Sequence, residues 1–257
     1  MTRAHTLRGP RCATTKAIVA LLSPSALLID MDGVLVDSEP LWEQVTDDFC
    51  RRRGARYDEH DVVACVGRGI RHSAVYLAER YGFAGSADEH TLEILADFAK
   101  RAPGVAACAG AESLLRGLRG RIPLALGTSS SRAVVEASLG ARGWLPLFDA
   151  IVTGDDVAHP KPAPDIYARC AALLGVEVSR ALVLEDSLPG ATSGKAAGAQ
   201  VIAVLGPARA PMSPDLVRVA DHVARDLVEV LALLAVARSA SAVPPRHDDH
   251  AGTERAV

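Results

Sequence analysis

The sequence lacks paired cysteines, massed basic residues and long apolar runs. Its five cysteines lie far apart in the 257-residue chain and none forms a CxxC pair, which argues against a disulfide framework and against a zinc site. The net charge is −3, and Lys and Arg are spread along the chain, so no nucleic-acid partner is expected. We therefore expect reduced thiols in a cytoplasmic protein.

The apolar stretch near the N-terminus is too short for membrane insertion. A basic segment precedes the sequence AIVALL, which is followed by Ser23 and Pro24. A signal peptide needs an apolar core of about 7–15 residues, and a membrane span needs about 20. We therefore expect residues 1–24 to form a flexible extension. Residues 239–257 are small, polar and proline-containing and are expected to form a disordered tail.

What the sequence does contain is an alternation of short apolar runs and amphipathic segments. The apolar runs are ALLID, IPLALG, AIVTG, ALVLED and VIAVLG, and continuous runs of this kind are typical of parallel strands buried on both faces. Helical patterns lie between them, at 131–140, 164–174, 189–198 and about 225–238. The alternation predicts an α/β fold with a doubly wound, Rossmann-like parallel sheet.

One interval shows no strand pattern. Between Pro40 and Pro103 the sequence has only helical patterns, near 40–53, 58–65, 70–81 and 88–101, which are separated by glycines. A helical interval of this length after the first strand indicates an insertion. We therefore expect an inserted α-helical cap at residues 37–103 and an α/β core formed by residues 25–36 and 104–238.

Two carboxylates lie at the end of the first apolar run. In ALLIDMDGVLVDSEPLW, one residue separates Asp30 from Asp32, so in extended geometry both side chains lean to the same face. The ligand site of an open parallel sheet lies beyond the carboxyl ends of its strands. Neighbouring carboxylates repel each other unless a cation intervenes, and Mg²⁺ binds carboxylates together with phosphate oxygens. The pair therefore indicates a Mg²⁺ site.

The two aspartates can take different roles in phosphoryl transfer. With Mg²⁺ holding it ionised, Asp30 can attack phosphorus and form an aspartyl-phosphate. Asp32 is then free to give a proton to the leaving oxygen and later to take one from water. Glu185 and Asp186 end the apolar run ALVLED and are expected at the same edge of the sheet.

Two further segments supply groups that bind a phosphoryl group. Thr128, in LALGTSSSR, lies at a strand end and helix start, where hydroxyl and backbone N–H groups bind anionic oxygens. Lys161, in HPKPAPDIY, lies between prolines that stiffen the segment and hold the cation in place. Positive charge at this position lowers the barrier to phosphoryl transfer, because the transition state spreads negative charge over three oxygens.

These four segments, in this order, resemble the motifs of the haloacid dehalogenase-like superfamily. DMDGVLVDSEPLW, the Thr128 segment, KPAPDIY and LEDSLPGATSGKAAG are similar to its β-phosphoglucomutase and sugar-phosphatase branch, which has a small helical cap. The resemblance covers about residues 25–235. The combination of four motifs is specific, whereas a single DxD motif is not.

The resemblance implies a role for each motif residue. Asp30 would be the nucleophile and Asp32 the general acid/base. Thr128 and Lys161 would stabilise the transferring phosphoryl group. The helical insertion would close over the site, exclude water and select the leaving group.

The resemblance also implies a metal site and a substrate site. Mg²⁺ would be held by Asp30, the backbone carbonyl of Asp32 and Asp186, and the sequence leaves open whether Glu185 binds the ion directly. Candidates for substrate contact come from the cap and from the loop after Thr128. They are Glu39, Trp42, Arg68, Arg71, His72, Ser129 and Ser130.

The predicted activity is hydrolysis of a small phosphomonoester, a sugar phosphate. The mutase branch of the superfamily carries a histidine at the position of Trp42, so a β-phosphoglucomutase-type phosphomutase is the alternative rather than the first choice. Dehalogenase chemistry attacks carbon, needs no metal and lacks the second aspartate that Asp32 supplies. A non-catalytic binding module is the remote alternative. We expect a monomer, with a dimer as the alternative, and no nucleic-acid or membrane partner.

Overall fold

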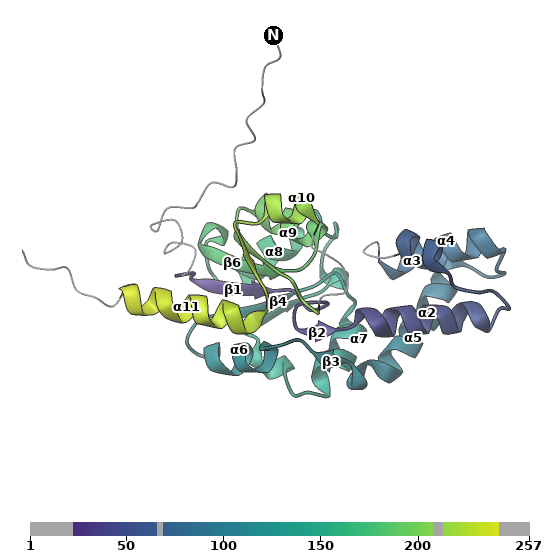
Figure 1. The fold of residues 1–257 in the computed structure, drawn as a ribbon, viewed down its shortest axis with the longest axis horizontal. Helices are drawn as coiled ribbons and strands as arrows, with labels where there is room; N and C mark the ends of the chain where they lie inside the picture. The colour runs from purple at the N-terminus through teal and green to yellow at the C-terminus, as the bar shows by residue number, and fades with distance from the viewer. Residues whose placement is uncertain (1–22, 66–68, 208–212, 242–257) are drawn as a thin grey trace, which may run out of the picture.

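A six-stranded parallel sheet forms the centre of the chain (Figure 1). The computed structural model describes residues 23–65, 69–207 and 213–241. The strand order is β5-β4-β1-β6-β7-β8. The bounds are β1 (Ala26–Ile29), β4 (Leu124–Gly127), β5 (Ala150–Val152), β6 (Ala181–Glu185), β7 (Gln200–Val204) and β8 (His222–Ala224). All except β8 lie in the apolar runs from which strands were predicted, with β7 beginning one residue before its run.

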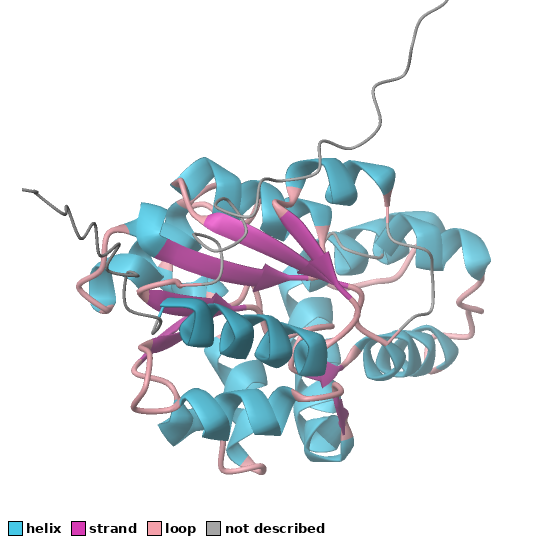
Figure 2. Cartoon of the chain, turned by 60° about the vertical axis from the view of Figure 1, so that its left-hand side comes forward, coloured by secondary structure: helices cyan, strands magenta, loops and turns pink. Residues whose placement is uncertain are grey.

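Helices cover both faces of this sheet, as Figure 2 shows. One face packs against α6 (Ala111–Leu118), α7 (Arg132–Val135) with its π-helical continuation Glu136–Gly140, and α11 (Leu227–Ser241). The other face packs against α8 (Asp165–Leu173), α9 (Leu188–Ala197) and α10 (Pro214–Val219). The predicted doubly wound α/β fold is therefore confirmed.

The two helical layers bury alternate residues of each strand. In β1, Leu27 and Ile29 belong to the apolar cluster under α6 and α11, whereas Ala26 and Leu28 belong to the cluster under α8 and α9. All four residues are fully buried. This explains the unbroken apolar runs, because a strand that is covered on both faces has no solvent-facing position.

Four helices form a second unit beside the sheet, which we call the cap. They are α2 (Glu39–Arg51), α3 (Glu59–Cys65), α4 (Ile70–Tyr81) and α5 (Ala87–Arg101), and they lie on the right of Figure 1. Their bounds agree within two residues with the four helices predicted from the sequence. A capping box between Ser86 and Glu89 fixes the start of α5, and a 3-10 turn, Ala102–Gly104, leads back to the core.

The chain enters and leaves the cap through one short antiparallel ribbon. β2 (Val36–Asp37) pairs with β3 (Ala106–Ala107), with Val36 opposite Ala107. The two connections therefore lie side by side, directly after the loop that carries Asp32. No sequence pattern predicts this ribbon, because strands of two residues are too short to show one.

The predicted C-terminal tail begins too early. α11 continues through Ser241, whereas the core was expected to end at 238 and a disordered tail to begin at 239. The start of the predicted N-terminal extension, residues 1–22, and the rest of the tail, 242–257, lie outside the described residues. Among the helices that the structure describes, none combines the length and the apolar character that crossing a bilayer requires.

Candidate active site

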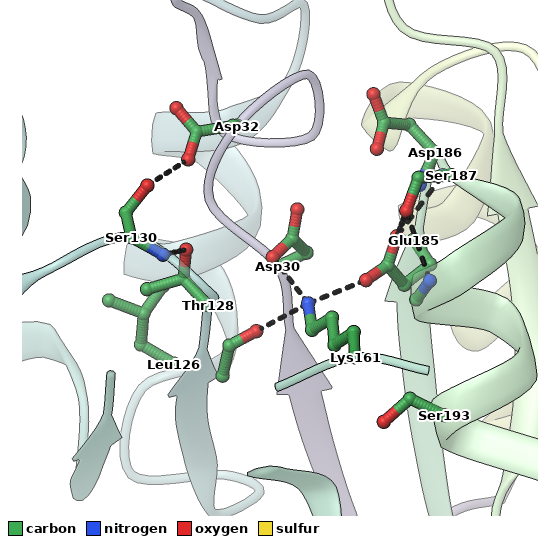
Figure 3. A network of polar contacts seen from close by, with 12 residues as sticks. Asp30, Asp32, Leu126, Thr128, Ser130, Lys161, Glu185, Asp186, Ser187 and Ser193 are labelled. Carbon is green, nitrogen blue, oxygen red and sulfur yellow. Dashed lines mark hydrogen bonds and ion pairs between the residues drawn. The ribbon is translucent and has the colours of Figure 1, made fainter. Parts of the chain in front are cut away.

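The candidate site lies where the strand order changes direction. From β1 the chain continues to β4 and β5 on one side, and then crosses to β6 on the other side of β1. Asp30 follows β1, Thr128 follows β4 and Glu185 ends β6. Open parallel sheets bind ligands at this topological position. The side chains predicted from separate motifs therefore meet at one edge (Figure 3).

Lys161 is the hub of the buried polar network at this edge. Its ammonium nitrogen lies 2.6 Å from Asp30 Oδ1, 2.6 Å from Glu185 Oε1 and 2.9 Å from the carbonyl oxygen of Gly127. Only 6% of the Lys161 side chain is exposed. Burial alone would lower the pKa of this ammonium, but the charges of Asp30 and Glu185 outweigh burial and raise it. Lys161 is therefore held as a cation against the nucleophile candidate.

Glu185 is held on both carboxylate oxygens. Oε1 accepts hydrogen bonds from Lys161 and from the Tyr167 hydroxyl, at 2.6 and 2.8 Å. Oε2 accepts from the Ser187 hydroxyl at 2.9 Å and from the backbone N–H groups of Asp186 and Ser187, both at 3.1 Å. A carboxylate offers about four lone-pair sites. Glu185 is thus fully occupied as an acceptor within the protein.

Three carboxylates gather beside Lys161. Oxygens of Asp30, Glu185 and Asp186 all lie within 4.8 Å of one another. Burial raises the pKa of Asp30 and of Asp186, and the neighbouring carboxylates raise both further, although Lys161 opposes this. A divalent cation would relieve the repulsion and keep the carboxylates ionised. The donor set, which consists of oxygens only, fits Mg²⁺.

The loop after β1 is shaped around Asp186. Gly33 has a φ of +76°, and a Cβ atom at this position would lie 1.8 Å from Asp186 Oδ2. Only glycine combines this backbone conformation with such a close approach. The loop that carries Asp32 can therefore lie directly against the third carboxylate. Since Glu185 is occupied by protein donors, Asp30 and Asp186 are the side chains better placed to hold an ion.

Asp32 points away from Asp30 and lies between two serine hydroxyls. Ser130 donates to Asp32 Oδ2 at 2.7 Å, and Ser38 donates to Oδ1. Figure 3 shows the Ser130 contact and the separation of the two aspartates. Ser38 immediately precedes α2 of the cap, whereas Ser130 follows β4 in the core. Asp32 is therefore tied to both units of the chain.

In the loop after β4, Thr128 is buried and Ser130 is half-buried. Thr128 is 1% exposed, and its hydroxyl accepts a hydrogen bond from the Ser130 backbone N–H at 3.0 Å. Ser129, the other predicted substrate contact in this loop, is exposed. Of the two serines, the structure brings Ser130 into the network and leaves Ser129 on the surface.

The described cap residues that were predicted to contact the substrate do not join the buried polar network at the sheet edge. Trp42 stacks on Phe98 with ring centroids 3.7 Å apart, so one face of the indole packs inside the cap. Arg71 forms an exposed ion pair with Asp88 at 3.0 Å. Glu39, at the start of α2, and His72, on α4, are exposed. Arg68 lies outside the described residues.

Three residues of the network, Ser38, Tyr167 and Ser187, were not singled out from the sequence. Ser38 follows Asp32 by six positions, and Tyr167 follows Lys161 by six. Ser38 and Tyr167 stand within the quoted motifs DSEPLW and HPKPAPDIY, and Ser187 stands within LEDSLPGATSGKAAG. The signal for Tyr167 is a hydroxyl near the start of α8, on the helix face that packs against the sheet.

Comparison with known proteins agrees with this geometry. The family model described as haloacid dehalogenase-like hydrolase matches residues 27–204. This range begins at β1, ends with β7 and includes the whole cap. It contains each of the carboxylates, the lysine and the threonine at the sheet edge.

Two curated relatives illustrate the range of the family. The bifunctional riboflavin kinase/FMN phosphatase of Arabidopsis thaliana is 32% identical over 208 residues, which are 80% of this chain and 54% of that protein. The fructose-1-phosphate phosphatase YqaB of Escherichia coli is 30% identical over 187 residues, which are 70% of this chain and 96% of that protein. The chain thus spans about half the length of the plant relative and nearly all of the bacterial one.

A solved structure extends the agreement to three dimensions. The hydrolase of this family from Deinococcus radiodurans R1, determined with bound phosphate and sodium, is 32% identical with a TM-score of 0.68. The match covers 84% of this chain and 97% of that one. Together with the family match over more than half of the sequence, it leads to one conclusion: the chain belongs to the haloacid dehalogenase-like hydrolase family.

Proposed function

We propose that this protein is a Mg²⁺-dependent phosphatase that hydrolyses a small phosphomonoester, a sugar phosphate, through an aspartyl-phosphate on Asp30. The observation that carries the proposal is the 2.6 Å contact between the Lys161 ammonium and Asp30 Oδ1 at the switch point of the sheet. A buried cation next to a buried carboxylate suits a nucleophile that must approach a negatively charged phosphoryl group.

In the first step, Asp30 forms a bond to phosphorus and the bond from phosphorus to the substrate oxygen breaks. Asp32, protonated at that stage, gives its proton to the leaving oxygen. The Lys161 ammonium and the Thr128 hydroxyl are placed to stabilise the phosphoryl oxygens. When bound by Asp30, Asp186 and the backbone carbonyl of Asp32, Mg²⁺ supplies positive charge that offsets repulsion between nucleophile and phosphate.

In the second step, water attacks the phosphorus of the aspartyl-phosphate. Asp32, now a carboxylate, takes a proton from this water, and the bond between phosphorus and Asp30 breaks. Asp30 is regenerated and inorganic phosphate leaves. The hydroxyl groups of Ser38 and Ser130 suit this second state, because each can donate to one oxygen of an ionised Asp32.

The names of the relatives support a sugar phosphate as the substrate, and a feature of the cap supports hydrolysis as the reaction. Curated relatives are named as phosphatases of fructose 1-phosphate, hexitol phosphates and validoxylamine A 7'-phosphate. The indole of Trp42 stacks on Phe98 at the entrance to the cap, where the mutase branch would have an imidazole. Hydrolysis is therefore the reaction proposed, rather than transfer of the phosphoryl group within one sugar.

The test is phosphate release from a panel of sugar phosphates, with Mg²⁺ and with a chelator. The panel includes fructose 1-phosphate, hexitol phosphates and β-glucose 1-phosphate, the last coupled to detection of glucose 6-phosphate. We expect Mg²⁺-dependent release of phosphate, and none from the Asp30→Asn variant. Formation of glucose 6-phosphate without phosphate release would overturn the phosphatase in favour of a mutase.

A further inference from the structure

We propose that Tyr167 is a positioning residue that fixes the Lys161 ammonium against Asp30 through the hydrogen bonds of its hydroxyl to Lys161 and to Glu185. The proposal rests on the proposed function, because Lys161 matters only if Asp30 receives a phosphoryl group. Tyr167 lies on α8 and is fully buried. Its role concerns two other side chains and requires no contact with the substrate.

The direction of each hydrogen bond of the Tyr167 hydroxyl is set by its partners. The hydroxyl oxygen lies 2.9 Å from Lys161 Nζ and 2.8 Å from Glu185 Oε1. An ammonium can only donate and a carboxylate can only accept. The phenol must therefore accept from Lys161 and donate to Glu185. If the hydroxyl hydrogen pointed towards Lys161 instead, neither of these hydrogen bonds could form.

Lys161 has more acceptors than hydrogens. Asp30, Glu185, the Gly127 carbonyl and the Tyr167 hydroxyl all lie 2.6–2.9 Å from its nitrogen, but an ammonium has three N–H groups. When one N–H turns to a phosphoryl oxygen, the other two still have several acceptors that keep the nitrogen in place. Tyr167 is a neutral acceptor in this set and holds the nitrogen without adding charge.

Glu185 has little freedom to compensate for loss of the Tyr167 hydroxyl. Its Oε2 is held by Ser187 and two backbone N–H groups. A Cβ atom on Gly190 would lie 1.7 Å from Oε1, so α9 closes directly over the carboxylate. Without the phenol, Oε1 keeps one strong partner, Lys161, and draws the ammonium away from Asp30.

The substitution that isolates this role is Tyr167→Phe. It retains the ring, whose centroid lies 4.7 Å from Lys161 Nζ, and removes only the hydroxyl. Because Lys161 stabilises charge that develops during transfer, we expect kcat to fall about tenfold and KM to change less than about threefold. The matched control is Tyr81→Phe, which removes a hydroxyl that donates to the buried Asp61 at 2.7 Å, and which should leave kcat unchanged.

A second measurement does not depend on turnover or on the identity of the substrate. Orthovanadate bound beside a nucleophile adopts the five-coordinate geometry of a phosphoryl group in transfer. Its affinity for the protein in the presence of Mg²⁺ can be measured by calorimetry. We expect Tyr167→Phe to weaken orthovanadate about tenfold and inorganic phosphate by less than about threefold. In a Glu185→Gln background, the same change should have a much smaller effect, because Tyr167 acts through Glu185.

The outcomes separate the two proposals. An active parent protein whose Tyr167→Phe variant matches it in kcat and in orthovanadate affinity would overturn the positioning role alone. Equal losses in kcat for Tyr167→Phe and Tyr81→Phe would do the same, since they would indicate a general loss of stability. A parent protein that neither releases phosphate nor binds orthovanadate would overturn the proposed function and, with it, this inference.

Discussion

At the scale of single residues, the site gathers two buried carboxylates around one buried ammonium. Asp30 and Glu185 are buried at 6% and 0% exposure, and each lies 2.6 Å from one ammonium. A buried charge is tolerated when it is paired and hydrogen-bonded. Each member of this group therefore depends on its neighbours, and replacing one changes the charge state of the others.

Replacing Asp30 by Asn should abolish turnover and retain the fold. The Asp30→Asn side chain has nearly the same shape and still offers an oxygen to Lys161, but it cannot form the aspartyl-phosphate. We expect phosphate release below detection and an unchanged circular dichroism spectrum. A folded variant that still releases phosphate at the parental rate would contradict the nucleophile assignment.

Replacing Asp32 by Asn should slow both chemical steps. An amide can neither give a proton to the leaving oxygen nor take one from water, so kcat should fall by roughly 10²–10⁴. Rapid-mixing measurements with an aryl phosphate would follow release of the leaving group and of phosphate separately. If only one of the two rates fell, Asp32 could not serve as the shared acid and base.

At the scale of elements, the close approach of α9 to the end of β6 sets the geometry of the site. Gly190 lies in the first turn of α9, over the carboxylate of Glu185. The Gly190→Ala variant would force Glu185 aside, so we expect a loss of about 1–3 kcal/mol in unfolding free energy together with most of the activity. Urea denaturation and phosphate release would measure the two effects.

A matched glycine substitution provides the control. Gly117 lies in α6 and is exposed, and a Cβ atom added to it would have nothing within 4 Å. Because glycine is a poor helix former, Gly117→Ala should stabilise the protein by roughly 0.5–1 kcal/mol and leave turnover unchanged. Stabilisation by both alanine substitutions would show that α9 has room above Glu185.

The helices and strands that could be predicted are those with a pattern longer than a turn. α2–α5 have helical periodicity broken by glycines, and β1, β4, β6 and β7 are continuous apolar runs. The ribbon of β2 and β3 and the edge strand β8 have only two or three residues each, and none of the quoted apolar runs marks them; β5 is equally short, but the run AIVTG indicated it. Periodicity needs more residues than these elements contain.

The contacts within the site were harder to predict than the residues that form it. The motifs indicated Asp32 and Ser130, but not the hydrogen bond that joins them across 98 positions of the chain. Likewise, Glu185 was a metal-ligand candidate, and its five protein donors come from side chains and backbone groups whose directions no motif records. Such directions depend on how β6, α8 and α9 pack, which is a property of the fold.

At the scale of the whole molecule, stability should depend jointly on pH and Mg²⁺. Burial raises the pKa of Asp30 and Asp186 above the usual carboxyl value, so without metal the folded state binds more protons than the unfolded state. Its stability should therefore fall as the pH rises above about 4 towards 8. Under the proposed function, Mg²⁺ binds these carboxylates in their ionised form, so it should stabilise the fold more at pH 8 than at pH 5.

Thermal unfolding with and without Mg²⁺ at the two pH values would measure this effect. At a concentration ten times its Kd, Mg²⁺ should contribute about 1.4 kcal/mol, or roughly 3–5 °C in Tm for a chain of this size. An equal rise in Tm at pH 5 and pH 8 would argue against ion binding at these carboxylates. The variant Asp186→Asn should lose most of the Mg²⁺-dependent rise at pH 8.

The paired strands β2 and β3 also define a junction at which the cap could be deleted and the chain closed again. Asp37 lies opposite Ala106, so a two-residue Asn-Gly turn between them would close an ordinary β-hairpin in place of the cap. The order of the six sheet strands would be unaffected, since none of them lies between these two positions. By the same geometry, a lid of another size or specificity could be grafted at this junction without a new path for the core chain.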